Sequence, residues 1–370
     1  MAKVHRPQAG WVTALKAVLV FILFLLALLG FIVLFSATGS WRPLLLVAIV
    51  ALALGALWVG LARLLRRHRP GRPPFWRAWL GASGVWSLAL LALLGLPLLA
   101  VIWINTTRPL AVPRVTLSDG QKEVVFQGMI HIGSEAYYQA IIFDMTRAAD
   151  LNYVLLFEGV RPGSAANVTR LNELLGTQGT NLNQVYDAFA QQCGLRFQNE
   201  YFGVFGDDLA DSPGQFVNAD VSIDDMMAEW DRLLAEHPEW AAAQPAATPE
   251  EQVDTQLDGF MGQLNAMTPG QRRLTEMACH TYLNVAFSRL GGAKPPFNEQ
   301  VVLDYRNRNL AQAILQQPAA RLYVTYGFDH FRGVYRLLQE ANPDWQIVDV
   351  AWRQAIDSTT EIERELQLAE

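Results

Sequence analysis

The chain has 370 residues, is 51% hydrophobic and carries a formal net charge of −6 at pH 7. Residues 1–118 hold 12 Lys and Arg and no Asp or Glu, whereas residues 119–370 hold all 35 acidic residues and only 17 of the 29 basic ones. This division indicates two parts that sit in different surroundings. The acidic balance of the second part argues against nucleic acid as a partner.

Three apolar segments predict a membrane anchor over residues 1–108. Residues 14–35 are apolar apart from Lys16, and residues 43–62 and 80–104 carry no charge. Each segment can cross a hydrocarbon core of about 30 Å at about 1.5 Å per residue. A cleaved signal peptide would explain the first segment, but its apolar run is too long and two more segments follow. We therefore expect three transmembrane helices.

The distribution of arginine predicts the orientation of this anchor. The loop between the second and third segments holds six arginines, and the loop between the first and second holds only Arg42. Because positively charged loops stay in the cytoplasm, the N-terminus is expected there and the chain after residue 108 outside. We expect an integral protein of the bacterial inner membrane with a periplasmic C-terminal domain.

The sequence pattern of residues 109–370 predicts an α/β domain. The expected strands are 114–117, 123–126, 153–157, 216–217, 321–326 and 346–350. The expected helices are 134–149, 165–175, 223–236, 250–266, 269–290, 297–315 and 331–340. Residues 176–215 favour short elements and loops, and residues 241–249 an exposed connection. Strands and helices at both ends around a helical middle indicate a sheet with a helical insertion at about 222–316.

A repeated pattern marks the candidate site. The strand around residues 124–127 leads into Gly128-Met129-Ile130-His131, and the strand at 321–326 leads into Gly327-Phe328-Asp329-His330. Ligands of open α/β sheets bind beyond the carboxyl ends of strands, where Glu158 also follows a strand. Two imidazoles and a carboxylate at such an edge can hold a divalent metal ion with positions left open for water. Hydrogen-bonded structural histidines are the alternative.

Other polar residues have two interpretations each. Arg306 and Arg308 either reach the site to bind a ligand or lie on an exposed helix face with local ion pairs. Asp220 and Asp329 are candidates first for helix N-caps and second for the site. His237 is expected to be solvated, and His280 to face a core.

The two cysteines, Cys193 and Cys279, form no CxxC motif, so they indicate neither a Cys-based metal site nor a redox site. They either pair in a disulfide or remain two buried thiols.

Together these motifs resemble the TraB/PrgY/GumN family, to which the animal Tiki proteases belong and whose wider relation is the erythromycin-esterase/ChaN-like fold. The resemblance rests on the two Gly-x-x-His motifs, the strand that ends in Glu158, the run Tyr305–Asn309 and the segment Gly327–Gly333 with Leu337-Leu338. It implies a membrane-tethered, metal-dependent protease. By position, it implies His131, Glu158 and His330 as metal ligands and Arg306 as a supporting residue.

The leading hypothesis is therefore a membrane-anchored, extracytoplasmic, metal-dependent hydrolase that acts on peptides or proteins. His131, Glu158 and His330 would hold Mn²⁺, Co²⁺ or Zn²⁺, and Asp329 or a second carboxylate would act as a general base. A non-catalytic module that binds a ligand through Arg306 is the alternative from another class. A hydrolase that uses His131 without a metal ion is a third hypothesis.

Overall fold

The structure is a computed structural model, and it describes residues 9–65, 73–175, 182–203, 212, 214–243, 267–288 and 296–356. The chain divides into two compact units. The first comprises Met1–Arg108 and Met267–Thr281, and the second comprises Pro109–Ala266 and Tyr282–Glu370. Of the elements expected from sequence, the helix at 250–266 and most of the connection at 241–249 lie outside the described residues.

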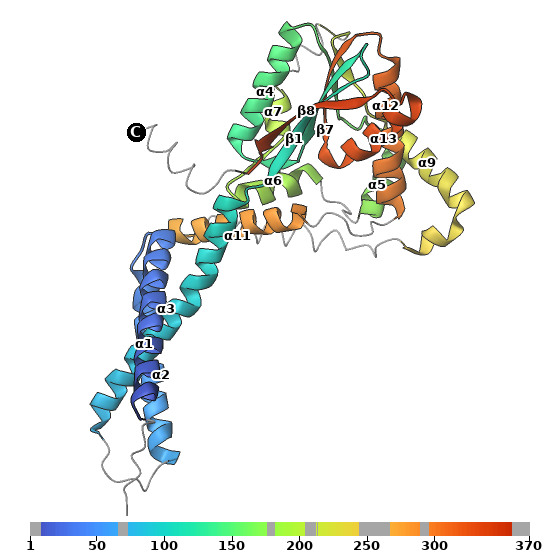
Figure 1. The fold of residues 1–370 in the computed structure, drawn as a ribbon. Coiled ribbons are helices and arrows are strands. Elements are labelled where there is room, and N and C mark those ends of the chain that lie inside the picture. The colour runs from blue at the N-terminus through green and yellow to red at the C-terminus, as the bar shows by residue number, and fades with distance from the viewer. Residues whose placement is uncertain are drawn as a thin grey trace, which may run out of the picture. The chain divides into compact units, whose positions relative to one another are not determined.

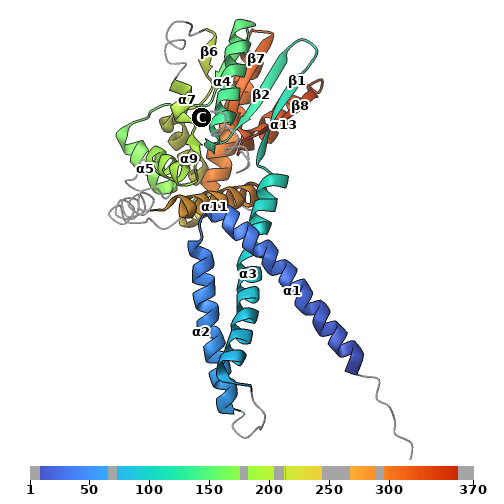
Figure 2. The ribbon, with the colours of Figure 1, turned by 90° about the vertical axis from the view of Figure 1, so that its left-hand side faces the viewer.

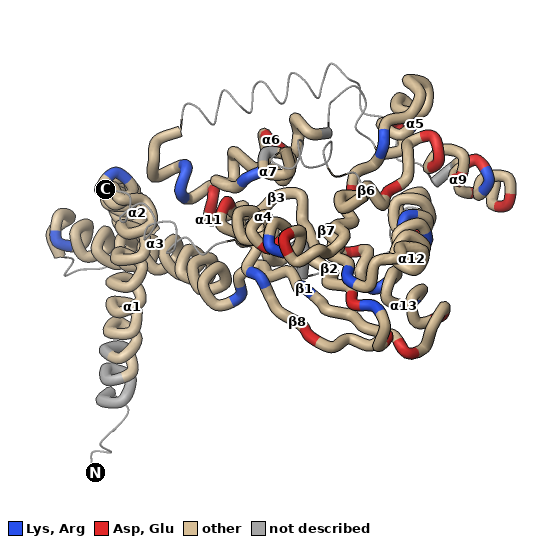
Figure 3. Tube along the Cα trace, turned by 90° about the horizontal axis from the view of Figure 1, so that it is seen from above, with Lys and Arg blue, Asp and Glu red and all other residues tan. Residues whose placement is uncertain are grey.

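The first unit contains three long apolar helices, α1 (Ala9–Thr38), α2 (Arg42–Leu65) and α3 (Phe75–Thr107), which almost lack charged residues in Figure 3. Each is long and apolar enough to cross a membrane. Small residues let them approach closely: a Cβ on Gly95 would lie 2.1 Å from the Cα of Gly30, and a Cβ on Gly55 would lie 2.2 Å from Oγ of Ser83. Such contacts are typical of helix pairs in membranes.

Helix α11 (Pro269–Ser288) begins in this first unit rather than in the domain to which the sequence analysis assigned it. The buried Asn105 of α3 donates through Nδ2 to the carbonyl of Met277 over 3.1 Å and accepts from Oγ1 of Thr281 over 3.3 Å. These bonds explain why the first part of α11 groups with the apolar helices.

The second unit is built on a six-stranded sheet with the order β6-β4-β7-β2-β1-β8. The bounds of its strands are β1 Ala111–Ser118, β2 Glu123–Met129, β4 Val154–Phe157, β6 Phe216–Asn218, β7 Arg321–Gly327 and β8 Gln346–Gln354. Strands β6, β4, β7 and β2 are parallel, and β1 pairs antiparallel with both β2 and β8. A second, two-stranded sheet joins β3 (Ile132–Gly133) to β5 (Arg196–Phe197).

The β1–β2 hairpin turns between Ser118 and Glu123, which pair with each other. Gly120 has φ +86°, a conformation that glycine adopts without strain. Oδ1 of Asp119 accepts from the backbone N–H groups of Gln121 and Lys122, over 3.0 and 2.7 Å. The turn is therefore fixed by its own side chain.

Helices cover both faces of the sheet (Figures 1 and 2). On one face, α12 (Arg306–Gln316) and α13 (Phe331–Ala341) bury a core that includes Leu310, Val324 and Leu338. On the other face, α4 (Glu135–Asp150) buries a core that includes Ile141, Met145 and Tyr323. The prediction of an α/β domain is confirmed.

A third core gathers around Trp230 of α9 (Ile223–Glu236), with Leu174 of α5 (Ala165–Leu175) and Val301 of the π-helix η3 (Asn298–Tyr305). The remaining elements are α6 (Leu182–Gln192), α7 (Asn199–Phe202), η2 (Pro238–Ala243) and η4 (Phe328–His330). Sequence patterns predicted α5 and α9 with these bounds. They missed α6, which has 11 residues.

Candidate functional site

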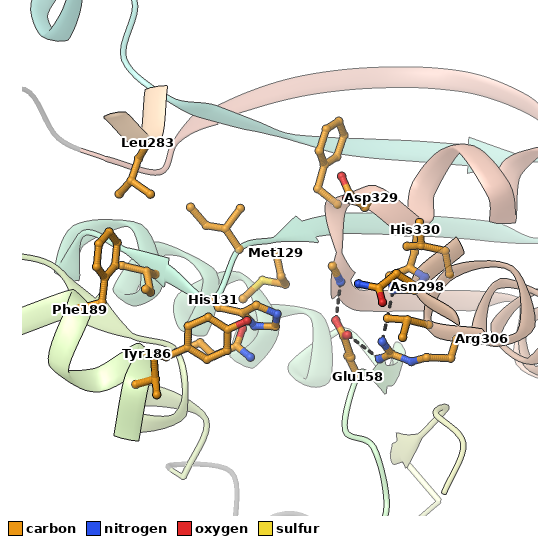
Figure 4. Close-up of a pocket in the computed structure, with 18 residues that line it drawn as sticks. Met129, His131, Glu158, Tyr186, Phe189, Leu283, Asn298, Arg306, Asp329 and His330 are labelled. Carbon is orange, nitrogen blue, oxygen red and sulfur yellow. Dashed lines mark hydrogen bonds and ion pairs between the residues drawn. The ribbon is translucent and has the colours of Figure 1, made fainter. Parts of the chain in front are cut away.

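The carboxyl ends of the four parallel strands meet at one edge of the sheet. His131 follows β2, Glu158 follows β4, Asp220 follows β6 and His330 follows β7. A pocket of about 620 Å³ opens there, and its wall includes His131, Glu158, Arg306, Asp329 and His330. Figure 4 shows His131 and Tyr186 on one side of this pocket and Arg306 and His330 on the other, with Glu158 between them. The sequence therefore placed its candidate residues at the correct edge.

The centre of the site is the guanidinium of Arg306, whose side chain is 6% exposed. Nη2 lies 2.5 Å from Oε1 of Glu158 and 2.6 Å from Oδ2 of Asp220, and Nε donates to Oδ1 of Asp220 over 2.9 Å. Such bidentate charge-assisted pairs are strong and hold a fixed geometry. Nη1 is the one guanidinium nitrogen that none of these carboxylate bonds uses.

Arg306 stands at the junction of η3 and α12. In the π-helical turns of η3 each backbone hydrogen bond spans one residue more than in an α-helix, and such turns are frequent at functional sites. Asn298, Val302 and Leu303 of η3 line the pocket together with Arg306. No sequence pattern predicted this change of helix type.

The three charges shift one another's ionisation. Burial is the largest influence on Glu158 and acts to raise its pKa, but the charge and the hydrogen bond of Arg306 oppose burial, and the net result is a lowered pKa. Burial and Arg306 oppose each other in the same way at Asp220, whose pKa is also lowered. Burial acts to lower the pKa of Arg306, but its carboxylate partners raise it. Both carboxylates and the guanidinium are therefore charged at neutral pH.

Glu158 is held on both of its oxygens. Its Oε2 accepts from the backbone N–H of Gly327 over 2.6 Å, while Oε1 accepts from Arg306. A Cβ at position 327 would lie 3.2 Å from this carboxylate. The glycine of the second Gly-x-x-His motif therefore lets the strand end approach Glu158 closely.

His330 is buried and neutral. Its Nδ1 donates to Oδ1 of Asn307 over 2.8 Å, and its Nε2 faces Nη1 of Arg306 at 3.5 Å. Burial, followed by the charge of Arg306, lowers the pKa of His330 to about 4. Gly333 makes room for the first of these contacts, since a Cβ there would meet Nδ2 of Asn307 at 2.1 Å.

His131 differs from His330 because its ring is exposed. The ring centroids of His131 and Tyr186 lie 5.0 Å apart, and the carbonyl of His131 accepts from the N–H of Gln198 over 3.0 Å. The backbone is therefore fixed while the imidazole stays open to the pocket.

The other polar residues that the sequence analysis named have different outcomes. Arg308 is exposed and pairs with Glu229 over 2.7 Å, which is the local ion pair that was the alternative to a site role. His237 is exposed and stacks on Trp240, and His280 is buried, both as expected. Asp329 lines the pocket, but position 330, rather than 329, is the N-cap of α13.

For Asp220 the sequence analysis preferred a helix N-cap to a role in the site, and the structure reverses this preference. The N-cap of α9 is Ser222, and Asp220 instead binds Arg306 with a side chain that is 0% exposed. The available signal was its position directly after the short strand at 216–217, at the same edge as Glu158. The sequence analysis had considered Asp220 first as a helix cap and only second as a residue of the site.

The sequence predicts a divalent ion held by His131, Glu158 and His330. The observed contacts indicate whether these three side chains fit around one ion. The guanidinium of Arg306 lies between the carboxylate and the imidazole of His330, and both oxygens of Glu158 already accept hydrogen bonds. Among the residues that the structure describes, no group of three His, Cys, Asp or Glu is placed to hold a metal ion. In this arrangement the three do not fit around one ion, and the ion stays a prediction from the resemblance.

Comparison of the chain with models of protein families, with curated proteins and with solved structures found no match. The site is therefore interpreted from its own geometry.

Proposed function

We propose that this chain is a membrane-anchored hydrolase of peptides whose α/β domain works on the extracytoplasmic side. The three apolar helices support the anchor, and the arginines between the second and third helices support this orientation. A disulfide between Cys193 and Cys279, one of the two interpretations of these cysteines, would favour the same side of the membrane, because disulfides persist in oxidising compartments such as the periplasm.

One observation carries the proposal of hydrolysis: the exposed imidazole of His131 lines the same pocket as the buried Arg306–Glu158 pair. His131 takes a proton from a water molecule, and the oxygen of that water attacks the carbonyl carbon of the substrate. Nη1 of Arg306 donates to the carbonyl oxygen as negative charge develops on it. The bond to the leaving amine then breaks, and the amine receives the proton from His131.

The remaining groups hold Arg306 in place for this task. Glu158 and Asp220 fix the plane of the guanidinium, and the neutral His330 faces Nη1 without adding a second positive charge. Groups that are held before the substrate arrives need no rearrangement during the reaction. Two aliphatic side chains and one aromatic side chain of the pocket, Val302, Leu283 and Phe189, offer an apolar wall that suits a peptide.

The test is cleavage of a peptide library by the full chain in detergent. His131→Ala should reduce cleavage by about 100- to 10,000-fold, as expected for loss of a general base. His237→Ala is the matched control, because that ring is also exposed but lies outside the pocket. Both variants should keep the thermal stability of the wild type. Peptide binding without cleavage by the wild type would favour the binding module instead.

A further inference from the structure

A second, smaller cavity of about 170 Å³ adjoins the main pocket. Met129, Glu158 and Gln198 line both. The rest of the wall of the smaller cavity has four large apolar side chains, Met145, Phe157, Phe202 and Phe216, and two polar residues, Asn199 and Thr325. We call this cavity the side pocket.

The side pocket lies in the core that α4 buries against the sheet. Met145 and Phe216 are buried members of that core, and Phe157 and Phe202 pack against it. Protein cores are close-packed, and voids larger than a water molecule are few. A void of this size that adjoins a site therefore has the character of a binding feature rather than a packing defect.

The size and lining of the side pocket indicate its occupant. An apolar cavity of about 150 Å³ stays dry and binds benzene. The side pocket is slightly larger, and five of its nine lining residues are aromatic or thioether side chains, which contact aromatic rings favourably. Its polar lining residues are Glu158, Gln198, Asn199 and Thr325. The side pocket and the main pocket meet at Glu158. The backbone of a substrate held by Arg306 would pass this point.

We propose that the side pocket is a specificity pocket that takes an aromatic side chain, such as that of phenylalanine, next to the bond that is cleaved. This inference rests on the proposed function for the cleavage step only. Binding of the aromatic side chain is a property of the cavity itself. Phe202 is the residue best suited to a test, because it lines the side pocket from the short helix α7 and is only partly buried.

The first experiment compares two fluorogenic peptides that differ only in phenylalanine or alanine beside the cleaved bond. The wild type should show a kcat/KM at least about tenfold higher for the phenylalanine peptide. Phe202→Trp, which places a larger ring in the wall of the side pocket, should lower kcat/KM for the phenylalanine peptide to about the value for the alanine peptide. Phe143→Trp is the matched control, since Phe143 is 64% exposed on α4, outside both pockets, and should behave as the wild type.

The second experiment uses binding alone. Calorimetry of the full chain in detergent should show phenylalaninamide binding at least about tenfold more tightly than alaninamide, with the difference lost in Phe202→Trp and kept in Phe143→Trp. Crystals of the full chain under xenon should show the gas in the side pocket. Binding selectivity without cleavage would keep this inference and reject the hydrolase. Equal binding of the two amides, with no xenon in the side pocket, would overturn it whether or not peptides are cleaved.

Discussion

Arg306 and Glu158 are separated by 148 positions in the chain, yet Nη2 of the arginine lies 2.5 Å from Oε1 of the glutamate. With Asp220, this pair places two negative charges and one positive charge on side chains that are 19%, 0% and 6% exposed. A buried charge is tolerated only when it is paired and hydrogen-bonded. The pair therefore governs both the stability of the domain and the charge of its pocket.

Replacement of Arg306 by methionine should lower the free energy of unfolding by about 3–5 kcal/mol, because two buried carboxylates lose their partner. Adding Glu158→Gln and Asp220→Asn to this variant should recover most of the loss. Arg308→Met is the control and should cost less than about 1 kcal/mol, since its ion pair is exposed. The measurement is chemical denaturation of the full chain in detergent. Equal losses for the two arginines would show that the pair is not buried as described.

The stability of the domain should rise as the pH increases from about 4 to 6.5. In this window the unfolded chain protonates His330 near pH 6.5, whereas burial keeps the folded chain unprotonated until about pH 4. Since the unfolded state binds more protons, stability rises with pH, by about 3 kcal/mol over the whole window. The carboxylates of Glu158 and Asp220 add a further loss below this range, because their pKa values are lowered.

His330→Gln should flatten the dependence of stability on pH in this window. His237→Gln, which changes an exposed histidine, should leave the dependence as in the wild type. Denaturation measured at half-unit steps of pH distinguishes the three proteins. A slope that His330→Gln does not change would mean that His330 is not buried in its neutral form.

Removal of divalent ions should change the rate of peptide cleavage by less than about twofold and the melting temperature by less than about one degree. The reason is that Arg306 already neutralises the charge of Glu158. The measurement is activity and melting temperature after dialysis against a chelator. Metal content is determined in parallel. Loss of activity that Mn²⁺, Co²⁺ or Zn²⁺ restores would instead establish the metal-dependent reaction that the family resemblance implies. The His131→Ala and His330→Ala variants would then lose the ion.

A phosphatase reporter fused at the C-terminus should be active, whereas the same reporter fused at Arg69 should be inactive. The reason is the concentration of arginine in the loop between α2 and α3, which by the positive-inside rule should keep that loop in the cytoplasm. A fluorescent protein that matures only in the cytoplasm should give the opposite pattern at the two positions. Phosphatase activity at Arg69 would reverse the proposed orientation.

Local sequence patterns predicted those parts of the fold that depend on neighbouring residues. Ser134 was expected to begin a helix, and its side chain accepts from the N–H of Tyr137. The amphipathic pattern of residues 223–236 predicted α9 with its observed bounds. Strand β8 continues to Gln354, four residues beyond the predicted end, because its last residues pair with the start of β1, from Arg114↔Ala351 to Ala111↔Gln354.

Contacts between distant segments could not be predicted in the same way. The sequence placed His131, Glu158 and His330 at one edge, since carboxyl ends of parallel strands meet there. It could not show that Arg306 lies between Glu158 and His330, because this depends on the packing of η3 and α12. The partnership of Arg306 with Asp220 depends on the same packing, and a residue before a helix is more often a cap.

The order of the strands has a consequence for the biogenesis of the domain. Strand β7 lies between β2 and β4, although it begins at residue 321 and β4 ends at residue 157. While the chain emerges from the ribosome, β2 and β4 each present an open edge until β7 arrives, and open edges of this kind favour pairing with other chains. The parallel centre of the sheet is therefore completed only when 327 of the 370 residues have been made.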